Sequence, residues 1–325
     1  MAHAGIPRNQ RRTVSKADVL EALNIIDIDK GRRDRVLLME NEFRQRINTH
    51  LDALPQEDSV FDKFKTSPFV IMFYAYQKGF ARVHEVEEAI LPAKVFSSME
   101  TSAGRMLEAI TLPVYGWQVV ESEMHTPDSA LDGKRAEAGL VKVATLKSGP
   151  RCLNDEMSEN FADAIKDHAQ SWARSANVSS VEFTYGVLYG TKAQSNKKDW
   201  HILRKLCEKL NPEEVLDPPL HKWDCAFSRN GITTNVTVRV GLEWWQYLTG
   251  DEHGYLEICC ALIRACVIPS QIDYAADSPT YKISDLSEIV STRTVPADFN
   301  ISLLQKSQIE WVFFLVRHFC DAITD

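Results

Sequence analysis

Apolar residues recur with a period of two in three segments of the chain and with a helical period between them. The alternating segments are LVKVATLK (140–147), VSSVEFTYGVLY (178–189) and TTNVTVRVG (233–241), which are rich in β-branched and aromatic residues. Such runs predict β-strands. Because helical segments separate and flank them, we expect an α/β fold with a mixed, partly antiparallel central sheet covered by helices.

Helical spacing of apolar residues predicts most of the remaining chain. The expected helices are one ending near Leu23 and others at 33–51, 83–92, 101–113, 153–174, 200–210, 255–267 and 302–323. We expect Pro92 and Pro113 to end the third and fourth of these, because proline interrupts a helix.

Three segments follow from this pattern. Residues 1–55 form an N-terminal helical segment for DNA contact or dimerisation, residues 56–267 form the core, and residues 268–325 form a C-terminal helical extension. Residues 55–59 resemble a linker. The apolar stripes of 33–51 and 302–323 have no obvious partner within their own segments, so both are candidate dimer interfaces.

Composition indicates a protein without membrane spans. The chain has 325 residues, of which 44% are hydrophobic, enough for one large or two modest domains with a core. No apolar run reaches membrane length and the N-terminus lacks the apolar segment of a signal peptide, so we expect a cytoplasmic protein. Seven cysteines without a CxxC pair predict free thiols.

The net charge of −8 is unusual for a nucleic-acid-binding protein, which normally carries a basic surface. The charge is uneven, since residues 1–47 hold ten basic and seven acidic side chains. The densest basic segment is 192–205. A basic cleft in an acidic body therefore stays compatible with the sequence.

The strand at 140–147 ends in a polar face that a buried sheet does not normally carry. Thr145 and Lys147 follow Val141 and Val143 on that face, and Asp132 precedes the strand in SALDGK. This arrangement resembles the PD-(D/E)xK nucleases, in which an upstream carboxylate and a strand ligand hold Mg²⁺, and a lysine two residues further orients or deprotonates the attacking water.

The sequence departs from the PD-(D/E)xK motif at two points, and each leaves an alternative residue assignment open. The second motif position is usually Asp or Glu, whereas Thr145 offers only a hydroxyl or carbonyl oxygen. A glutamate of the following helix, Glu156 or Glu159, could supply the missing carboxylate, and the helical geometry favours Glu156. A literal Pro-Asp pair at 127–128 makes Asp128 an alternative to Asp132.

A longer series of short matches runs from about residue 68 to 251. It comprises GRMLEAITLP (104–113), LDGK (131–134), VATLKSG (143–149), GVLYG (186–190), ILRKL (202–206) and GLEWWQYLTGD (241–251). In order and spacing it resembles the family of type II restriction endonucleases related to the enzyme that cuts interrupted GG-N-CC palindromes.

The resemblance implies Mg²⁺-dependent hydrolysis of double-stranded DNA by a restriction-endonuclease-like core. Asp132 would be the first metal-binding carboxylate, Thr145 the second motif position, Lys147 the catalytic lysine and Glu108 an acidic residue on the preceding helix. It also implies a restriction-modification system with a cognate DNA methyltransferase. A palindromic site has two-fold symmetry, so we expect a homodimer.

The basic segment is the candidate for DNA recognition. Its cations are Lys192, Lys197, Lys198, Arg204 and Lys205. Asn154, an amide at the start of the preceding helix, is a further candidate. Arg and Lys suit guanine, which predicts a G·C-rich palindrome, with Arg204 reading a base and Lys197 and Lys198 contacting phosphates. An ordinary solvated surface is the alternative, and the arginine-rich segment 32–46 is the second candidate.

Two other functions remain possible at this stage. A DNA-binding or structural protein with a decayed nuclease core would carry the same strands and the same Thr145. A repair or mobile-element nuclease would cut without a fixed sequence. The sequence contains no P-loop, GxGxxG, HExxH or GxSxG motif.

Overall fold

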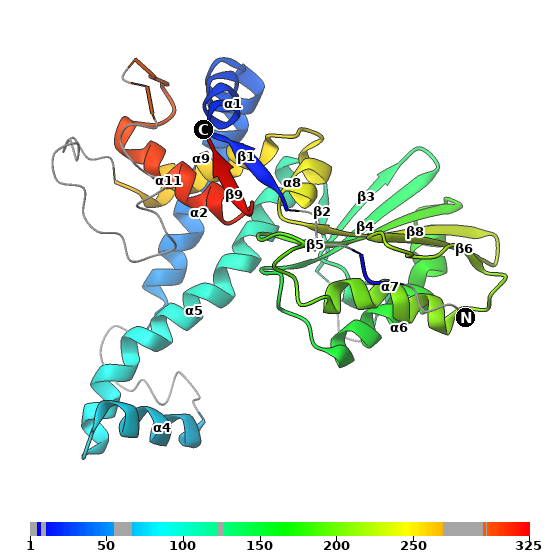
Figure 1. Cartoon of the computed structure of the whole chain (residues 1–325), viewed down its shortest axis with the longest axis horizontal. Coiled ribbons are helices and arrows are strands. Elements are labelled where there is room, and N and C mark those ends of the chain that lie inside the picture. The colour runs from blue at the N-terminus through cyan, green and yellow to red at the C-terminus, as the bar shows by residue number, and fades with distance from the viewer. Residues whose placement is uncertain (1–4, 8–10, 55–66, 122–125, 269–294, 297) are drawn as a thin grey trace.

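The computed structural model describes residues 5–7, 11–54, 67–121, 126–268, 295–296 and 298–325. Figure 1 shows a helical body beside a body built on a β-sheet, with helix α5 (Val83–Val114) running from the sheet past the helical body. The expected linker at 55–59 lies outside the described residues. No described helix combines the length and the apolar character needed to cross a bilayer.

The central sheet has seven strands and is mixed, as the sequence predicts. In sheet order the strands are β2 (Gln118–Val119), β3 (Gly133–Glu137), β4 (Leu140–Lys147), β5 (Ser180–Val187), β8 (Ile232–Val240), β7 (Asp224–Arg229) and β6 (Val215–Asp217). β4, β5 and β8 are parallel to one another, whereas β3 and β7 pair antiparallel with β4 and β8. The carboxyl ends of the three parallel strands therefore lie at one edge.

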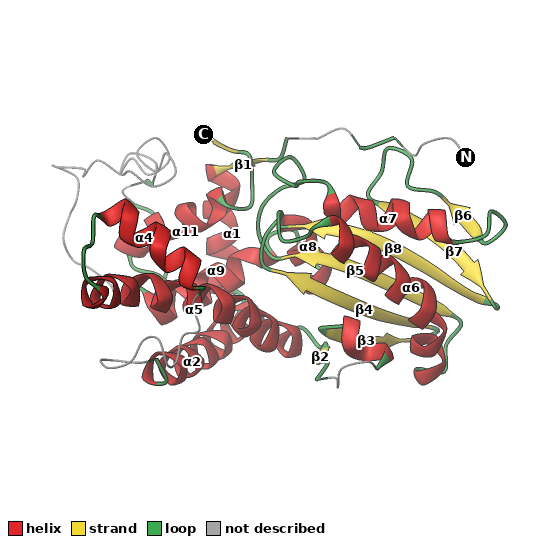
Figure 2. Cartoon of the chain, turned by 90° about the horizontal axis from the view of Figure 1, so that it is seen from below, coloured by secondary structure: helices red, strands yellow, loops and turns green. Residues whose placement is uncertain are grey.

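The two faces of β4 belong to different cores. Val141 and Val143 pack with α6 (Asp155–Ser175) and α7 (Lys198–Lys209), and Figure 2 shows these helices across one face of the sheet. Ala144 and Leu146 point to the opposite face and join the helical cluster. The predicted alternation of side chains along β4 is confirmed. Thr145 and Lys147 therefore lie on the face of the sheet that α6 covers.

The helical body collects elements from both ends of the chain. Its described helices are α1 (Lys16–Ile28), α2 (Lys30–Asp52), α8 (Leu242–Thr249), α9 (Gly254–Cys266) and α11 (Lys306–Arg317), and α4 (Pro68–Lys78) lies apart on α5. A short parallel pair, β1 (Thr13–Ser15) with β9 (Ala322–Thr324), joins the two ends. The N-terminal and C-terminal segments thus share one hydrophobic cluster with α8 and α9.

The two apolar stripes that were candidate dimer interfaces have partners within the chain. α2 buries Val36, Met39 and Phe43 against α9, and α11 buries Val312 and Phe313 in the same cluster. Both stripes pack against α9, which lies outside their own segments, so the proposal that they form the dimer interface is wrong. Neither buried stripe is available to a second subunit.

The arginines of α2 also bind within the chain. Arg35 donates two hydrogen bonds to the Glu257 carboxylate, at 2.7 and 2.8 Å, and Arg32 pairs with Asp251 and lies 3.8 Å from Glu257. Arg44 pairs with Glu40 of its own helix and donates to the Arg264 carbonyl of α9 at 2.8 Å. These contacts dock α2 on α9, so these three arginines are structural in the free protein.

Helix α5 differs from the prediction at its first proline. Pro92 was expected to end a helix, but α5 continues through it to Val114. A proline costs one hydrogen bond within a helix, and α5 offsets this loss by packing against α4 and α2. Pro113 stands one residue from the end, as expected.

The cysteines are unpaired, and two adjacent tryptophans pack in the interior. All seven cysteines are free thiols, and Cys259 and Cys260 lie in the core, whereas Cys266 is exposed at the end of α9. Trp244 and Trp245 are buried, so this pair packs the core.

Candidate active site

A hairpin brings Asp132 beside Thr145. β3 and β4 are joined by a two-residue turn in which Gly139 has a φ of +78°, a left-handed conformation that glycine adopts easily. The register pairs Gly133 with Ala144, and the Asp132 amide donates to the Ala144 carbonyl at 2.8 Å. Asp132 therefore lies at the start of β3, opposite Thr145 near the end of β4.

One oxygen of the Asp132 carboxylate is fixed by two donors. Its Oδ2 accepts a hydrogen bond from the Leu146 amide at 2.6 Å and another from the Thr145 hydroxyl at 3.2 Å. The Thr145 side chain is only 2% exposed. Its hydroxyl hydrogen therefore points to Asp132, and in the described part of the chain the second oxygen, Oδ1, has no hydrogen-bond partner.

Lys147 follows on the same face of β4. Its Nζ donates to the Leu146 carbonyl at 2.9 Å and lies 5.7 Å from the centre of the Phe161 ring of α6. The ammonium group is half-buried and has no carboxylate within salt-bridge distance among the described residues. The positive charge of Lys147 therefore acts on the nearby Glu108 without forming an ion pair with it.

Glu108 reaches the same place from α5. The pKa of Glu108 is raised to about 7, mainly by burial and also by the negative charge of Asp132, while the charges of Lys147 and Arg105 act in the opposite direction. Glu108, Asp132 and Lys147 therefore interact electrostatically across three elements. Perturbed groups that gather in this way are typical of functional sites.

Helix α5 lies against the end of β4 at Gly104. A Cβ added at Gly104 would lie 3.6 Å from the Cβ of Ser148, the residue after Lys147. Arg105 follows Gly104 and is exposed, with no ion pair or side-chain hydrogen bond in the described regions. Arg105 was not among the site residues expected from the sequence, although it lies three residues before Glu108 and therefore on the same helix face.

The donors at this site suit a magnesium ion. Glu108 and Asp132 supply carboxylate oxygens, and a divalent cation between them would relieve the repulsion that raises the pKa of Glu108. Among the described residues, no three His, Cys, Asp or Glu side chains group closely enough to hold a metal. Two carboxylates are sufficient for Mg²⁺, which keeps several of its waters, but insufficient for a structural zinc.

The other acidic candidates are not brought into this cluster. Glu159 lies 3.1 Å from Lys205 and 3.3 Å from Lys209 of α7, and Glu156 is exposed near the start of α6. Asp128 belongs to a short 3-10 helix (Pro127–Ala130) that packs on α6. No hydrogen bond or ion pair in the described regions joins Glu156 or Asp128 to Asp132.

Two of the predicted DNA-binding lysines connect α7 to α6. Lys198 lies 2.6 Å from the Asp155 carboxylate, and Lys205 donates to the Glu159 carboxylate at 3.1 Å. With the apolar face of α7 buried beneath them, these pairs fix α7 on α6. Both lysines would have to change partners to contact DNA.

The remaining predicted DNA-binding residues also have contacts within the chain. Lys192 pairs with Glu243 at 2.6 Å, and Lys197 donates to the Lys192 carbonyl at 2.6 Å. Arg204 lies 3.6 Å from Glu208. Asn154 caps α6 by accepting from the Met157 amide at 2.8 Å.

The position of the basic loop agrees with the sequence analysis. β5 is the parallel neighbour of β4, with Lys147 opposite Val187, so the loop after β5 begins beside the end of β4 that carries Lys147.

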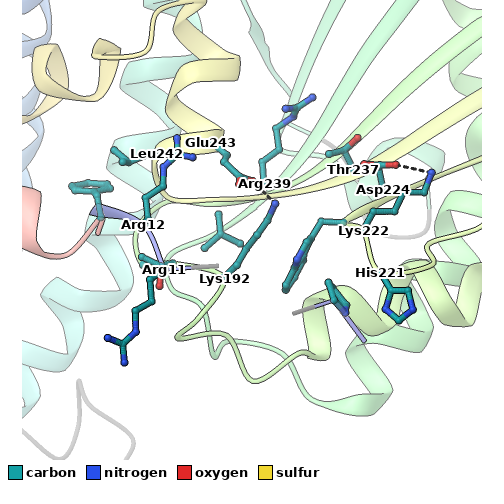
Figure 3. A pocket seen from close by; sticks show the side chains of 16 residues that line it. Arg11, Arg12, Lys192, His221, Lys222, Asp224, Thr237, Arg239, Leu242 and Glu243 are labelled. Atoms are coloured by element: carbon teal, nitrogen blue, oxygen red, sulfur yellow. Dashed lines mark ion pairs between the residues drawn. The ribbon is translucent and has the colours of Figure 1, made fainter. Parts of the chain in front are cut away.

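A cavity of about 430 Å³ lies beyond the ends of β5 and β8 and is lined by several basic side chains. In Figure 3 the Arg11 and Arg239 side chains point in different directions, and Lys222 pairs with Asp224 at 3.3 Å. Lys192 is held by Glu243. The cations of this cavity therefore do not converge on one anion.

The mixed α/β fold, with its seven-stranded sheet flanked by helices in the described residues, is consistent with that of a restriction endonuclease. A comparison with family models matches residues 41–210, more than half of the chain, to the type II restriction endonuclease EcoO109I family. The chain belongs to this family and is a type II site-specific DNA endonuclease. The match contains Glu108, Asp132, Thr145 and Lys147, and it confirms the family resemblance found in the sequence. No curated protein matches the chain.

Proposed function

We propose that the chain cuts double-stranded DNA by Mg²⁺-dependent hydrolysis of phosphodiester bonds at the cluster of Glu108, Asp132, Thr145 and Lys147. The observation that carries this proposal is the Asp132 carboxylate, with one oxygen fixed by Thr145 and Leu146 and the other left for a ligand. A decayed nuclease has no need to keep this carboxylate oriented beside an unpaired lysine.

Asp132 and Glu108 would hold the metal, and Mg²⁺ bound there supplies Lewis-acid stabilisation of the charge that develops on the scissile phosphate. Lys147 positions the attacking water and balances the same charge through its ammonium group. Thr145 is a positioning residue, because its hydroxyl donates to Asp132 Oδ2 and orients the carboxylate. Arg105 is close enough to this site to contact a neighbouring phosphate.

A homodimer is the simplest assembly for this reaction. The described chain contains one cluster of this kind, and two copies related by two-fold symmetry match the two strands of a palindrome. We place the protein in the cytoplasm, in a restriction-modification system whose methyltransferase protects the host DNA.

Recognition of a short G·C-containing palindrome, possibly interrupted, is proposed for the loop and helix from Lys192 to Lys205. Support comes from the position of this loop beside β4 and from the ability of Arg and Lys to bond guanine. Arg204 is the candidate base reader, because its nearest carboxylate, Glu208, lies at 3.6 Å on the exposed surface of the same helix.

Digestion of plasmid and phage DNA tests the proposal. With Mg²⁺ we expect discrete bands, and with EDTA in place of Mg²⁺ we expect intact DNA. A Lys147→Ala variant purified in parallel controls for contaminating nuclease. A smear would indicate a nuclease without fixed specificity, and intact DNA in every arm together with DNA binding would indicate a decayed core.

A further inference from the structure

Helix α4 is apolar on both of its faces, although only one of them is covered. Ile71, Tyr74 and Ala75 are half-buried against α5, and the Tyr74 hydroxyl donates to the Ala89 carbonyl at 3.5 Å. No residue of α4 is fully buried. A helix that is apolar all round is normally enclosed on all sides, whereas the outer face of α4 has no partner among the described residues.

The outer face is a regular stripe. It consists of Phe69, Met72, Phe73 and Tyr76, whose exposed fractions are 73%, 67%, 73% and 91%. These positions follow the spacing i, i+3, i+4 and i+7, which aligns side chains along one side of a helix. Phe96 of α5 is a further exposed aromatic residue, at 59%. We call the four α4 residues the α4 stripe.

Charge argues against DNA as the occupant. Within α4 the one ionisable cation is Lys78, and its Nζ lies 5.7 Å from the centre of the Tyr74 ring on the side of α5. The stripe itself carries no charge, and phosphate backbones are bound by cations. An apolar, aromatic surface of this kind suits another protein surface of the same character.

We propose that the α4 stripe is the contact between two copies of this chain, with α4 of one copy packed on α4 of the other. This inference rests on the proposed homodimer and identifies its surface. A two-fold interface places identical patches against each other, which an uncharged stripe permits without repulsion. The stripe exposes on the order of 600 Å² of side chain, about three quarters of the ~800 Å² that each partner buries in a standard interface.

The same surface would link assembly to catalysis. α5 carries the exposed Phe96 and, twelve residues later on the same continuous helix, Glu108 of the proposed active site. At 1.5 Å per residue the two positions are roughly 18 Å apart along the helix. Figure 1 shows α4 at the end of α5 that is remote from the sheet, so a contact there fixes the spacing of the two active sites through α5.

Light scattering after size exclusion tests the proposal. We expect the wild-type chain to have twice its monomer mass and the double variant Met72→Glu, Phe73→Glu to have the monomer mass with an unchanged circular dichroism spectrum. The matched control is Trp311→Glu, which changes an exposed aromatic residue of α11 and should leave the dimer intact. A dimeric double variant would overturn the proposed surface and leave the homodimer standing.

Cross-linking provides a second readout in case the charged variant does not fold. Oxidation of Phe73→Cys, in the middle of the stripe, should give a covalent dimer, whereas Ile28→Cys, an 81% exposed position on α1, should give no more than the wild type with its native cysteines. Equal cross-linking at both positions would contradict the proposal. A wild-type monomer, free and on DNA, would reject the homodimer as well, independently of any cleavage assay.

Discussion

The end of β4 and the contact between α6 and α7 both contain charged residues, but within the described chain these residues form ion pairs only between α6 and α7. Between α6 and α7, the cations Lys198, Lys205 and Lys209 each meet a carboxylate at hydrogen-bond distance. At the end of β4, Lys147 and Arg105 have no such partner among the described residues, and Glu108 has a raised pKa. Paired charges hold elements together, whereas unpaired charges held close to one another leave binding capacity for a ligand.

This difference was invisible in the sequence, where the segment 192–205 is the most conspicuous basic region. Two of its lysines, Lys198 and Lys205, pair with Asp155 and Glu159 some forty positions earlier. The cluster at β4 contains few charges, and only folding reveals that they lack partners. Charge density along the chain is therefore a poor guide to the site.

The first prediction concerns the unpaired lysine. Lys147→Ala should lower the cleavage rate by about 10²- to 10⁴-fold, the range for loss of a group that assists proton transfer, while DNA binding in Ca²⁺ stays near the wild-type level. Single-turnover cleavage and a gel-shift assay measure the two quantities. A variant that cuts at a near wild-type rate would remove Lys147 from the site.

The second prediction concerns a paired charge in the interior. Glu257 has a side chain that is 1% exposed and binds Arg35 and the Tyr115 hydroxyl. Glu257→Ala should lower the free energy of unfolding by about 3 kcal/mol, the lower end for broken buried ion pairs, because Arg35 is partly solvated. Urea unfolding measures this, and an unchanged midpoint would show that the pair contributes nothing.

The third prediction separates orientation from direct catalysis. Thr145→Val keeps the shape of the side chain but loses the donor to Asp132, so cleavage should slow by about 10- to 100-fold, as expected for a residue that orients a metal ligand. Thr145→Ser should recover most of the rate, because it restores the hydroxyl. If the serine variant is as slow as the valine variant, the hydrogen bond is irrelevant.

The smallest effect is expected at the surface of α7. Lys198→Ala removes the pair with Asp155, which is exposed, so stability should change little and the cleavage rate should stay within about twofold of the wild type. A uniform loss of affinity for all DNA sequences with a flatter salt dependence would instead identify Lys198 as a phosphate contact.

The sequence predicted the strands around the site because their apolar pattern is strong. LVKVATLK alternates over its whole length, so β4 and the face that carries Lys147 could be assigned without a structure. β3 was missed, since Gly133–Glu137 is short and polar and becomes a strand only by pairing with β4. The hydrogen bond of Thr145 to Asp132 depends on that pairing and could not be foreseen.

Partners far apart in the chain account for the other failures. The stripe of α2 is covered by α9, more than two hundred residues later, and no periodicity within either helix indicates this contact. The segment TSPFVIMFYAYQKGF (66–80) shows the converse error, because its apolar sequence suggests a buried part of the fold. In the structure its helix α4 leaves its aromatic residues exposed, and this marks the surface on which the proposed dimer depends.

The most direct test of the site is the comparison of Asp132→Ala with Asp128→Ala in Mg²⁺-dependent cleavage of the same DNA. The two aspartates lie four residues apart, and Asp132 alone is hydrogen-bonded to Thr145 and Leu146. We predict that Asp132→Ala is inactive at every Mg²⁺ concentration while still binding DNA, and that Asp128→Ala cuts at close to the wild-type rate. An active Asp132→Ala variant beside an inactive Asp128→Ala variant would contradict the proposed metal site.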